Sequence, residues 1–457
     1  MPDKRTCYLS ALAPELIEHI LLQFDSISAL GNFITTCHFV HVCFKRKQHR
    51  LVFHVLSNEL GPVLADARFL FLFKAPYTDT TSRRPHELIA YWDALHASGK
   101  VYRGMLHAGG KDDDGVISSE ELTQLCHTLH EMNFLVQAYV TAHQYTFGCS
   151  GSPVDTASLS RSERLRILRA FYRRQIICNA WAPTKRGSEV GWAQQDVAAI
   201  SNTSDHQSVP LGLFGSYEAW EWQHIDHIDY FVRRLCAALH LVSNWNGRDV
   251  DGLVIPTVLP RPPSEIDFDK LFSHAHKLTR CLRCYPRLAE TALHFIFSLP
   301  PRRARQLLYA APEYYQLSQR YFLPCLRYAW QASRFDTYPD PVMDAVTQQQ
   351  EQQEEDAAGR EEGSKINATV VFSKDEVHRP PFGWVDGLNT HFSNWFGEAL
   401  HSEVSTTRHH TKEKAYARMD ALMLWVAAGF ALWDKSTVMT MKKLDELELY
   451  QTGWIVQ

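Results

Sequence analysis

The sequence predicts an all-α protein, because its apolar residues recur at helical spacing and no segment shows a convincing β-strand alternation. Two capping-box patterns, with a serine three residues before a glutamate, begin apolar helical segments at Ser118 and Ser160. The chain has 457 residues, of which 45% are hydrophobic and 21% charged, so it is large enough for two or three globular domains. We expect a short three-helix module packed on a larger irregular helical domain with one flexible insertion.

The N-terminal module is expected to span residues 9–55 and to contain three short helices. The first helix carries an apolar strip made of Leu12, Leu16, Ile17, Ile20, Leu21 and Phe24. The second runs through Leu30, Phe33, Ile34 and Cys37. Asp25 or Ser26 is placed to cap the second helix, and the third begins near Phe39 and ends in the basic residues 45–47. A longer helix follows, and Pro62 is expected to kink or break it.

A helical domain is expected over residues 56–345. Its main helices are predicted within residues 118–132, 160–181, 220–242 and 270–285. Residues 346–366 are rich in Gln and Glu and nearly lack apolar side chains, so they predict a flexible linker or insertion. A C-terminal helical part, residues 367–457, is expected to pack on the central domain.

Charge and hydropathy exclude several classes of function. The net charge of -4 gives no general attraction for nucleic acid or an anionic membrane. The longest apolar run, residues 421–433, is shorter than the about 20 residues that span a bilayer. Glu15, Glu18 and His19 interrupt what would otherwise be a signal-peptide core, so we expect an intracellular protein, in the cytoplasm or nucleus, with reduced cysteines.

Residues 9–44, LSALAPELIEHILLQFDSISALGNFITTCHFVHVCF, resemble an F-box. The residues that match the family pattern are Leu12, Glu15, Leu16, Ile17, Ile20, Leu21, Phe24, Asp25 and Leu30. The sequence departs from the pattern at Ala13, where the family usually has proline, and it lacks the family's tryptophan near the third helix. Further segments, within residues 161–181, 219–231 and 425–434, resemble F-box-like proteins common in filamentous fungi, which are mostly uncharacterised.

This resemblance implies a protein–protein adaptor and not an enzyme: a substrate-receptor subunit of a cullin–RING ubiquitin ligase, recruited through a Skp-type adaptor. The residues expected to bind that adaptor are Leu12, Pro14, Leu16, Ile17, Ile20, Leu21 and Leu30. The helical body would capture a protein substrate. One alternative is that the same side chains pack on the helical domain that follows. Another, suggested by the missing proline at Ala13, is a non-ligase scaffold that retains an F-box-like N-terminus.

Other motifs give weaker hypotheses. Residues 110–121 resemble a calcium-binding loop through Asp112, Asp114 and Glu121, although Gly110 stands at the first ligand position. We therefore keep a calcium-binding protein as a third hypothesis and predict no catalytic residue, cofactor or metal site. The many arginines of residues 161–174 predict a helix with one apolar face and one solvated or ion-paired face.

Overall fold

The computed structural model describes residues 8–72, 117–147, 159–181, 217, 219–244, 275–284, 374, 376–387 and 429–441. Every regular element in these ranges is a helix, which confirms the all-α fold class. None of the helices described is both long enough and apolar enough to pass through a bilayer. The predicted insertion at residues 346–366 lies outside the described residues.

The first described range, residues 8–72, opens with one 3₁₀ turn and four short helices. They are η1 (Tyr8–Ala11), α1 (Pro14–Leu22), α2 (Ile27–Ile34), α3 (His38–Arg46) and α4 (Gln48–Leu60). Pro14 is the first residue of α1, where its missing N–H leaves no intrahelical bond unmade. The Ser26 hydroxyl caps α2 by accepting a hydrogen bond from the backbone N–H of Ala29 at 3.4 Å. Helices α1–α3 thus follow the sequence prediction closely.

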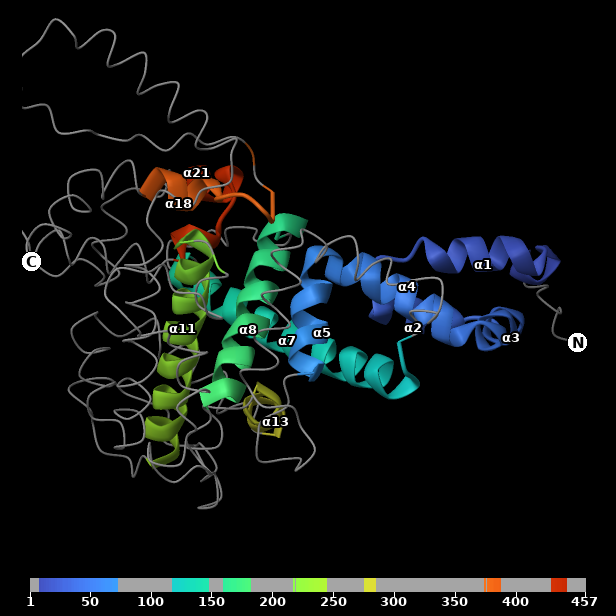
Figure 1. The fold of residues 1–457 in the computed structure, drawn as a ribbon, viewed down its shortest axis with the longest axis horizontal. Helices are drawn as coiled ribbons and strands as arrows, with labels where there is room; N and C mark the ends of the chain where they lie inside the picture. Colours follow the sequence, from blue (N-terminus) through green and yellow to red (C-terminus); the bar gives the residue numbers. More distant parts are fainter. Residues whose placement is uncertain are drawn as a thin grey trace, which may run out of the picture.

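These helices enclose a small apolar core of their own. Its buried members are Ile17, Leu21, Leu30, Val40, Cys43, Phe44, Leu51 and Val55. The first half of α4 closes this core, so the unit is built from four helices instead of the three expected. In Figure 1 the unit, coloured blue, lies at one end of the described structure, and α4 leads from it towards the other helices. We call this unit the N-terminal module.

Helix α4 belongs to two cores at once. Leu51 and Val55 lie in the core of the module, whereas Leu56 and Leu60 lie in the larger core that follows. The helix ends at Leu60 and is followed by Gly61, whose φ of 49° is in the left-handed region that favours glycine. A short 3₁₀ turn, η2 (Gly61–Val63), then leads into α5 (Leu64–Leu72), so the expected break at Pro62 is found.

The remaining helices form the part of the molecule that we call the body. They are α5, α7 (Ser119–Phe147), α8 (Arg161–Trp181), α11 (Ala219–Asn244), α13 (Ala275–Cys284), α18 (Phe382–Gly387), η9 (Phe430–Leu432) and α21 (Lys435–Met441). Helix α8 lies at the centre and packs on α5, α7 and α11 (Figure 1). The hydroxyls of Ser118 and Ser160 accept the N–H groups of Glu121 and Glu163, as predicted. The box at Ser160 is complete, because the Ser160 N–H also donates to the Glu163 carboxylate at 2.9 Å. At Ser118 the structure shows the serine half, while the Glu121 carboxylate accepts a hydrogen bond from Arg68.

Candidate partner-binding surface

Apolar side chains are left uncovered at the outer end of the N-terminal module. Leu16 is 52% exposed and Ile20 is 37% exposed, and their spacing of four residues puts them on the same face of α1. Tyr8, in the preceding turn, is 88% exposed. Among the described residues only one further large hydrophobic side chain, Met439, is exposed to a similar degree. Within the described ranges, the exposed large apolar side chains are therefore mostly on the module, and we call Leu16 and Ile20 the α1 ridge.

The structure divides the residues predicted to bind a Skp-type adaptor into two groups. Pro14, Leu16 and Ile20 are exposed and Leu12 is half-buried, so these four are open to a partner. Ile17, Leu21 and Leu30 are buried in the core of the module, where they pack with residues of α3 and α4.

This division follows from the helix geometry of α1. Each residue turns the helix by about 100°, so Ile17 and Leu21 face inward while Leu16 and Ile20 lie beside them on the outer face. A partner docked on the folded module would touch the exposed residues of α1, such as Leu16 and Ile20. The buried residues, such as Ile17 and Leu21, would hold α1 in the orientation that exposes them.

A basic segment lies on the opposite flank of α1. Lys45, Arg46 and Lys47 are exposed at the end of α3, where positive charge is favourable next to the helix C-terminus. Lys47 donates a hydrogen bond to the carboxylate of Glu18, and this contact lowers the pKa of Glu18. Glu18 therefore fastens α1 to the start of α4 on the side away from the ridge.

The module is joined to the body by Glu59, near the end of α4. The residue is only 4% exposed, and its carboxylate is shared by three other helices. One oxygen accepts the backbone N–H of Ile27, the first residue of α2, at 2.7 Å. The other oxygen accepts from Arg164 of α8 at 2.8 Å and from Asn133 of α7 at 3.2 Å. Glu59 thus links the module to two helices of the body.

Asn58 makes a second link beside Glu59. Its side-chain amide donates to the carbonyl oxygens of Leu22 and Phe24, at the end of α1, at 3.2 and 3.1 Å. Its own backbone carbonyl accepts a hydrogen bond from Arg161, in the first turn of α8, at 2.6 Å. The turn between α1 and α2 is therefore held by α4, which is held in turn by α8.

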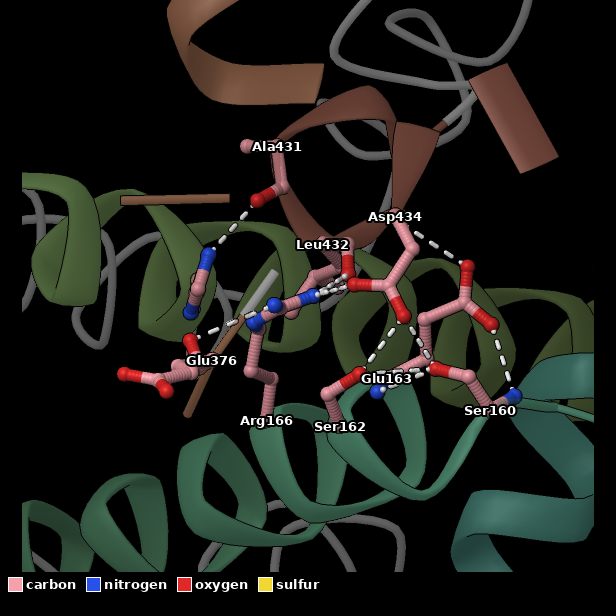
Figure 2. Close-up of polar contacts among 9 residues, drawn as sticks. Ser160, Ser162, Glu163, Arg166, Glu376, Ala431, Leu432 and Asp434 are labelled. Carbon is pink, nitrogen blue, oxygen red and sulfur yellow. Dashed lines mark hydrogen bonds and ion pairs between the residues drawn. The ribbon is translucent and has the colours of Figure 1, made fainter. Parts of the chain in front are cut away.

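Polar contacts also attach residues 429–441, which we call the C-terminal segment, to α8, as Figure 2 shows. The carboxylate of Asp434 accepts hydrogen bonds from Arg166 at 2.5 Å, from Ser162 at 2.6 Å and from Ser160. The backbone N–H of Asp434 donates to Glu163 at 2.9 Å. Burial alone would raise the pKa of Asp434, but Arg166 and the two hydroxyls lower it below its ordinary value.

A buried histidine closes the same region. The imidazole of His224, in α11, donates to the carbonyl oxygen of Ala431 at 2.6 Å. Burial and the nearby guanidinium of Arg166 lower its pKa well below the ordinary value, so the ring is neutral. These contacts hold residues of η9 against α8 and α11.

Five of the six arginines of α8 make ion pairs, and four of these five are buried. Arg169 and Arg173 share two carboxylates, Asp66 of α5 and Glu221 of α11, at nitrogen–oxygen distances of 2.8–3.8 Å. Arg174 pairs with Asp229 at 3.0 Å. The sequence predicted a solvated or ion-paired face, and the structure shows the ion-paired form. The acidic partners were not predicted, although the spacing of three and four residues between Arg166, Arg169 and Arg173 is a sign of one shared face.

The residues of the calcium hypothesis are only partly described. Asp112 and Asp114 lie outside the described residues, and Glu121 accepts a hydrogen bond from Arg68 at 2.7 Å. Within the ranges given above, no three His, Cys, Asp or Glu side chains are grouped so that they could hold a metal ion. Comparison with known proteins adds nothing to this geometry, since no family profile, curated protein or solved structure matches the chain.

Proposed function

We propose that this chain is a protein–protein adaptor that binds a partner through the α1 ridge. The observation that carries the proposal is the contrast between neighbours on α1: Ile17 is fully buried, whereas Leu16 is half exposed. The module already has its own core, so Leu16 and Ile20 are not needed to complete it. Their place on an outer face suits a partner with an apolar groove.

The ridge alone is too small to support a stable complex. Full burial of a leucine or isoleucine side chain contributes about 1.5–3 kcal/mol, and each of these two is already partly covered. Stable interfaces bury at least about 1,000 Å² in total. We therefore expect Leu16 and Ile20 to act as the central anchors, with Tyr8, Leu12 and Pro14 around them.

The resemblance of residues 9–44 to an F-box suggests which partner this is. We propose a Skp-type adaptor that connects the chain to a cullin, so that the chain works inside the cell as a substrate receptor of a ubiquitin ligase. The helical body would then carry the protein substrate. Such a receptor needs no catalytic residue of its own, because other subunits supply the chemistry.

Pull-down of a purified Skp-type adaptor by the full-length protein tests this proposal. Leu16→Asp and Ile20→Asp should each reduce recovery of the adaptor at least tenfold, because each places a charge in an apolar interface. Met439→Asp is the matched control, since Met439 is 43% exposed but lies on α21 in the body.

Three results would contradict the proposal. Wild-type protein that recovers no adaptor would favour the non-ligase scaffold. Ridge variants that bind like wild type would remove the ridge from the interface. An equal loss in Met439→Asp would mean that the effect is not specific to the module.

A further inference from the structure

We propose that Glu59 couples the partner-binding module to the body, so that the α1 ridge is held in place by α7 and α8 before any partner binds. The coupling is a property of the free protein. Its consequence for a bound partner rests on the function proposed above.

The first step is the position of Glu59 between the two cores. Leu56 and Leu60, on either side of it, belong to the core of the body, while Leu51 and Val55 belong to the core of the module. Partly buried Ile27 and Val52 pack against both cores. The carboxylate therefore lies where the two units meet.

The second step is that both sides are needed to satisfy this carboxylate. A buried charge is tolerated only when it is paired and hydrogen-bonded. The module supplies the N–H of Ile27, and the body supplies Arg164 and Asn133. Separation of either unit would leave a buried charge without part of its hydrogen bonding, so the module and the body should open together.

The third step connects this junction to the ridge. Asn58 holds the carbonyl groups at the end of α1, the helix that carries Leu16 and Ile20. Arg161 holds the backbone of Asn58 from α8. Any ligand that stabilises α1 should thus also stabilise α8, and the effect must be equal in the reverse direction.

Two buried cysteines report on the two units separately. Cys43 lies in the core of the module, and Cys236 lies in the core of the body. Alkylation of each thiol in the full-length protein, followed across a urea gradient and located by mass spectrometry, gives one unfolding midpoint per unit. In wild-type protein the two midpoints should coincide.

Glu59→Gln should separate the two midpoints, with Cys43 reacting at a urea concentration about 1 M below Cys236. Glu18→Gln is the matched control: it makes the same chemical change in a carboxylate that pairs only within the module, through Lys47 and Arg50, and its midpoints should stay together. If Glu59 only stabilised the protein and did not couple the two units, Glu59→Gln would lower both midpoints equally.

Coincident midpoints in Glu59→Gln, or separate midpoints in wild type, would overturn the proposal. If Glu59→Gln does not fold, Arg164→Met removes the same contact from the body side, where the arginine is about one third exposed. A common midpoint in that variant would likewise overturn it.

A purified Skp-type adaptor extends the test to the bound state. In wild type, saturating adaptor should raise both midpoints, whereas in Glu59→Gln it should raise only that of Cys43. An adaptor that raises neither midpoint counts against the proposed function alone, because the comparison in the free protein is made without it. An adaptor that raises the Cys43 midpoint alone in wild type would overturn the coupling.

Discussion

Leu16 and Ile17 are adjacent on α1, and the structure gives them opposite roles that two alanine variants can separate. Ile17 is fully buried in the core of the module. Ile17→Ala removes three carbons, which at about 0.8 kcal/mol each lowers the free energy of unfolding by about 2.4 kcal/mol. The cavity left behind adds to this loss, so we expect a total of about 3 kcal/mol.

Leu16→Ala should behave differently, because half of the Leu16 side chain is already in water. We expect a loss of at most about 1 kcal/mol, as is usual for surface positions. Urea unfolding followed by circular dichroism at pH 7 measures both variants in the same way. The affinity for a Skp-type adaptor, corrected for the fraction of protein that is folded, should show the reverse order. Leu16→Ala should lose more affinity than Ile17→Ala.

Equal destabilisation by the two alanine variants would refute this reasoning. It would mean that Leu16 is covered in solution by another part of the chain, and the ridge would then not be open to a partner. A decrease of less than about 1 kcal/mol in the free energy of unfolding of Ile17→Ala would also refute it, since truncation of a fully buried isoleucine in a packed core is more destabilising than that.

Three further variants test the body and the junction. Asp434→Ala leaves Arg166 buried without its carboxylate and should lower the free energy of unfolding by about 3–5 kcal/mol in urea titration; a loss below about 1 kcal/mol would exclude this pair as the anchor of the C-terminal segment. Burial lowers the pKa of His227 to about 3, so the unfolded state binds more protons below pH 6.5 and stability falls as the pH falls. Between pH 7 and 5, the free energy of unfolding of His227→Gln should therefore fall by about 2 kcal/mol less than that of wild type. An equal fall in both proteins would contradict burial of a neutral ring. Gly61→Ala should lower the free energy of unfolding by about 1 kcal/mol in thermal or urea unfolding, because φ at that position is positive, and an unchanged midpoint would argue against the positive φ.

Local patterns in the sequence predicted the helices well because their causes are local. Helices α8 and α11 were expected at residues 160–181 and 220–242 and are found at Arg161–Trp181 and Ala219–Asn244. The capping box at Ser118 located the start of α7, and the helix continues beyond Met132, the last residue of the apolar pattern named from the sequence, to Phe147. Apolar residues such as Leu135 and Tyr139 continue the buried face over this extension.

Which face of a helix is buried could not be predicted from one helix alone. The pattern of α1 contains both ridge residues and core residues, and only the positions of α3 and α4 decide that Ile17 is covered and Leu16 is not. The same holds for Glu59, which reads as an ordinary polar residue until α2, α7 and α8 are placed around it. Its partners lie 32 to 105 positions away in the sequence.

The ion pairs of the body give a reason for the fixed position of the module. Buried ion pairs add little net stability compared with apolar packing, but a mispaired arrangement is strongly unfavourable. A shift of α8 by one residue would turn Arg169 and Arg173 by about 100° away from Asp66 and Glu221. The pairs therefore set the register of α8 against α5 and α11.

The same register sets what the first turn of α8 presents to the module. Arg161 and Arg164 lie one to three turns before the ion-paired arginines on a continuous helix, so their positions follow from it. They reach Asn58 and Glu59 because α8 cannot slide without breaking buried pairs. We infer that the ionic interior of the body fixes, through α8 and α4, the direction in which Leu16 and Ile20 face.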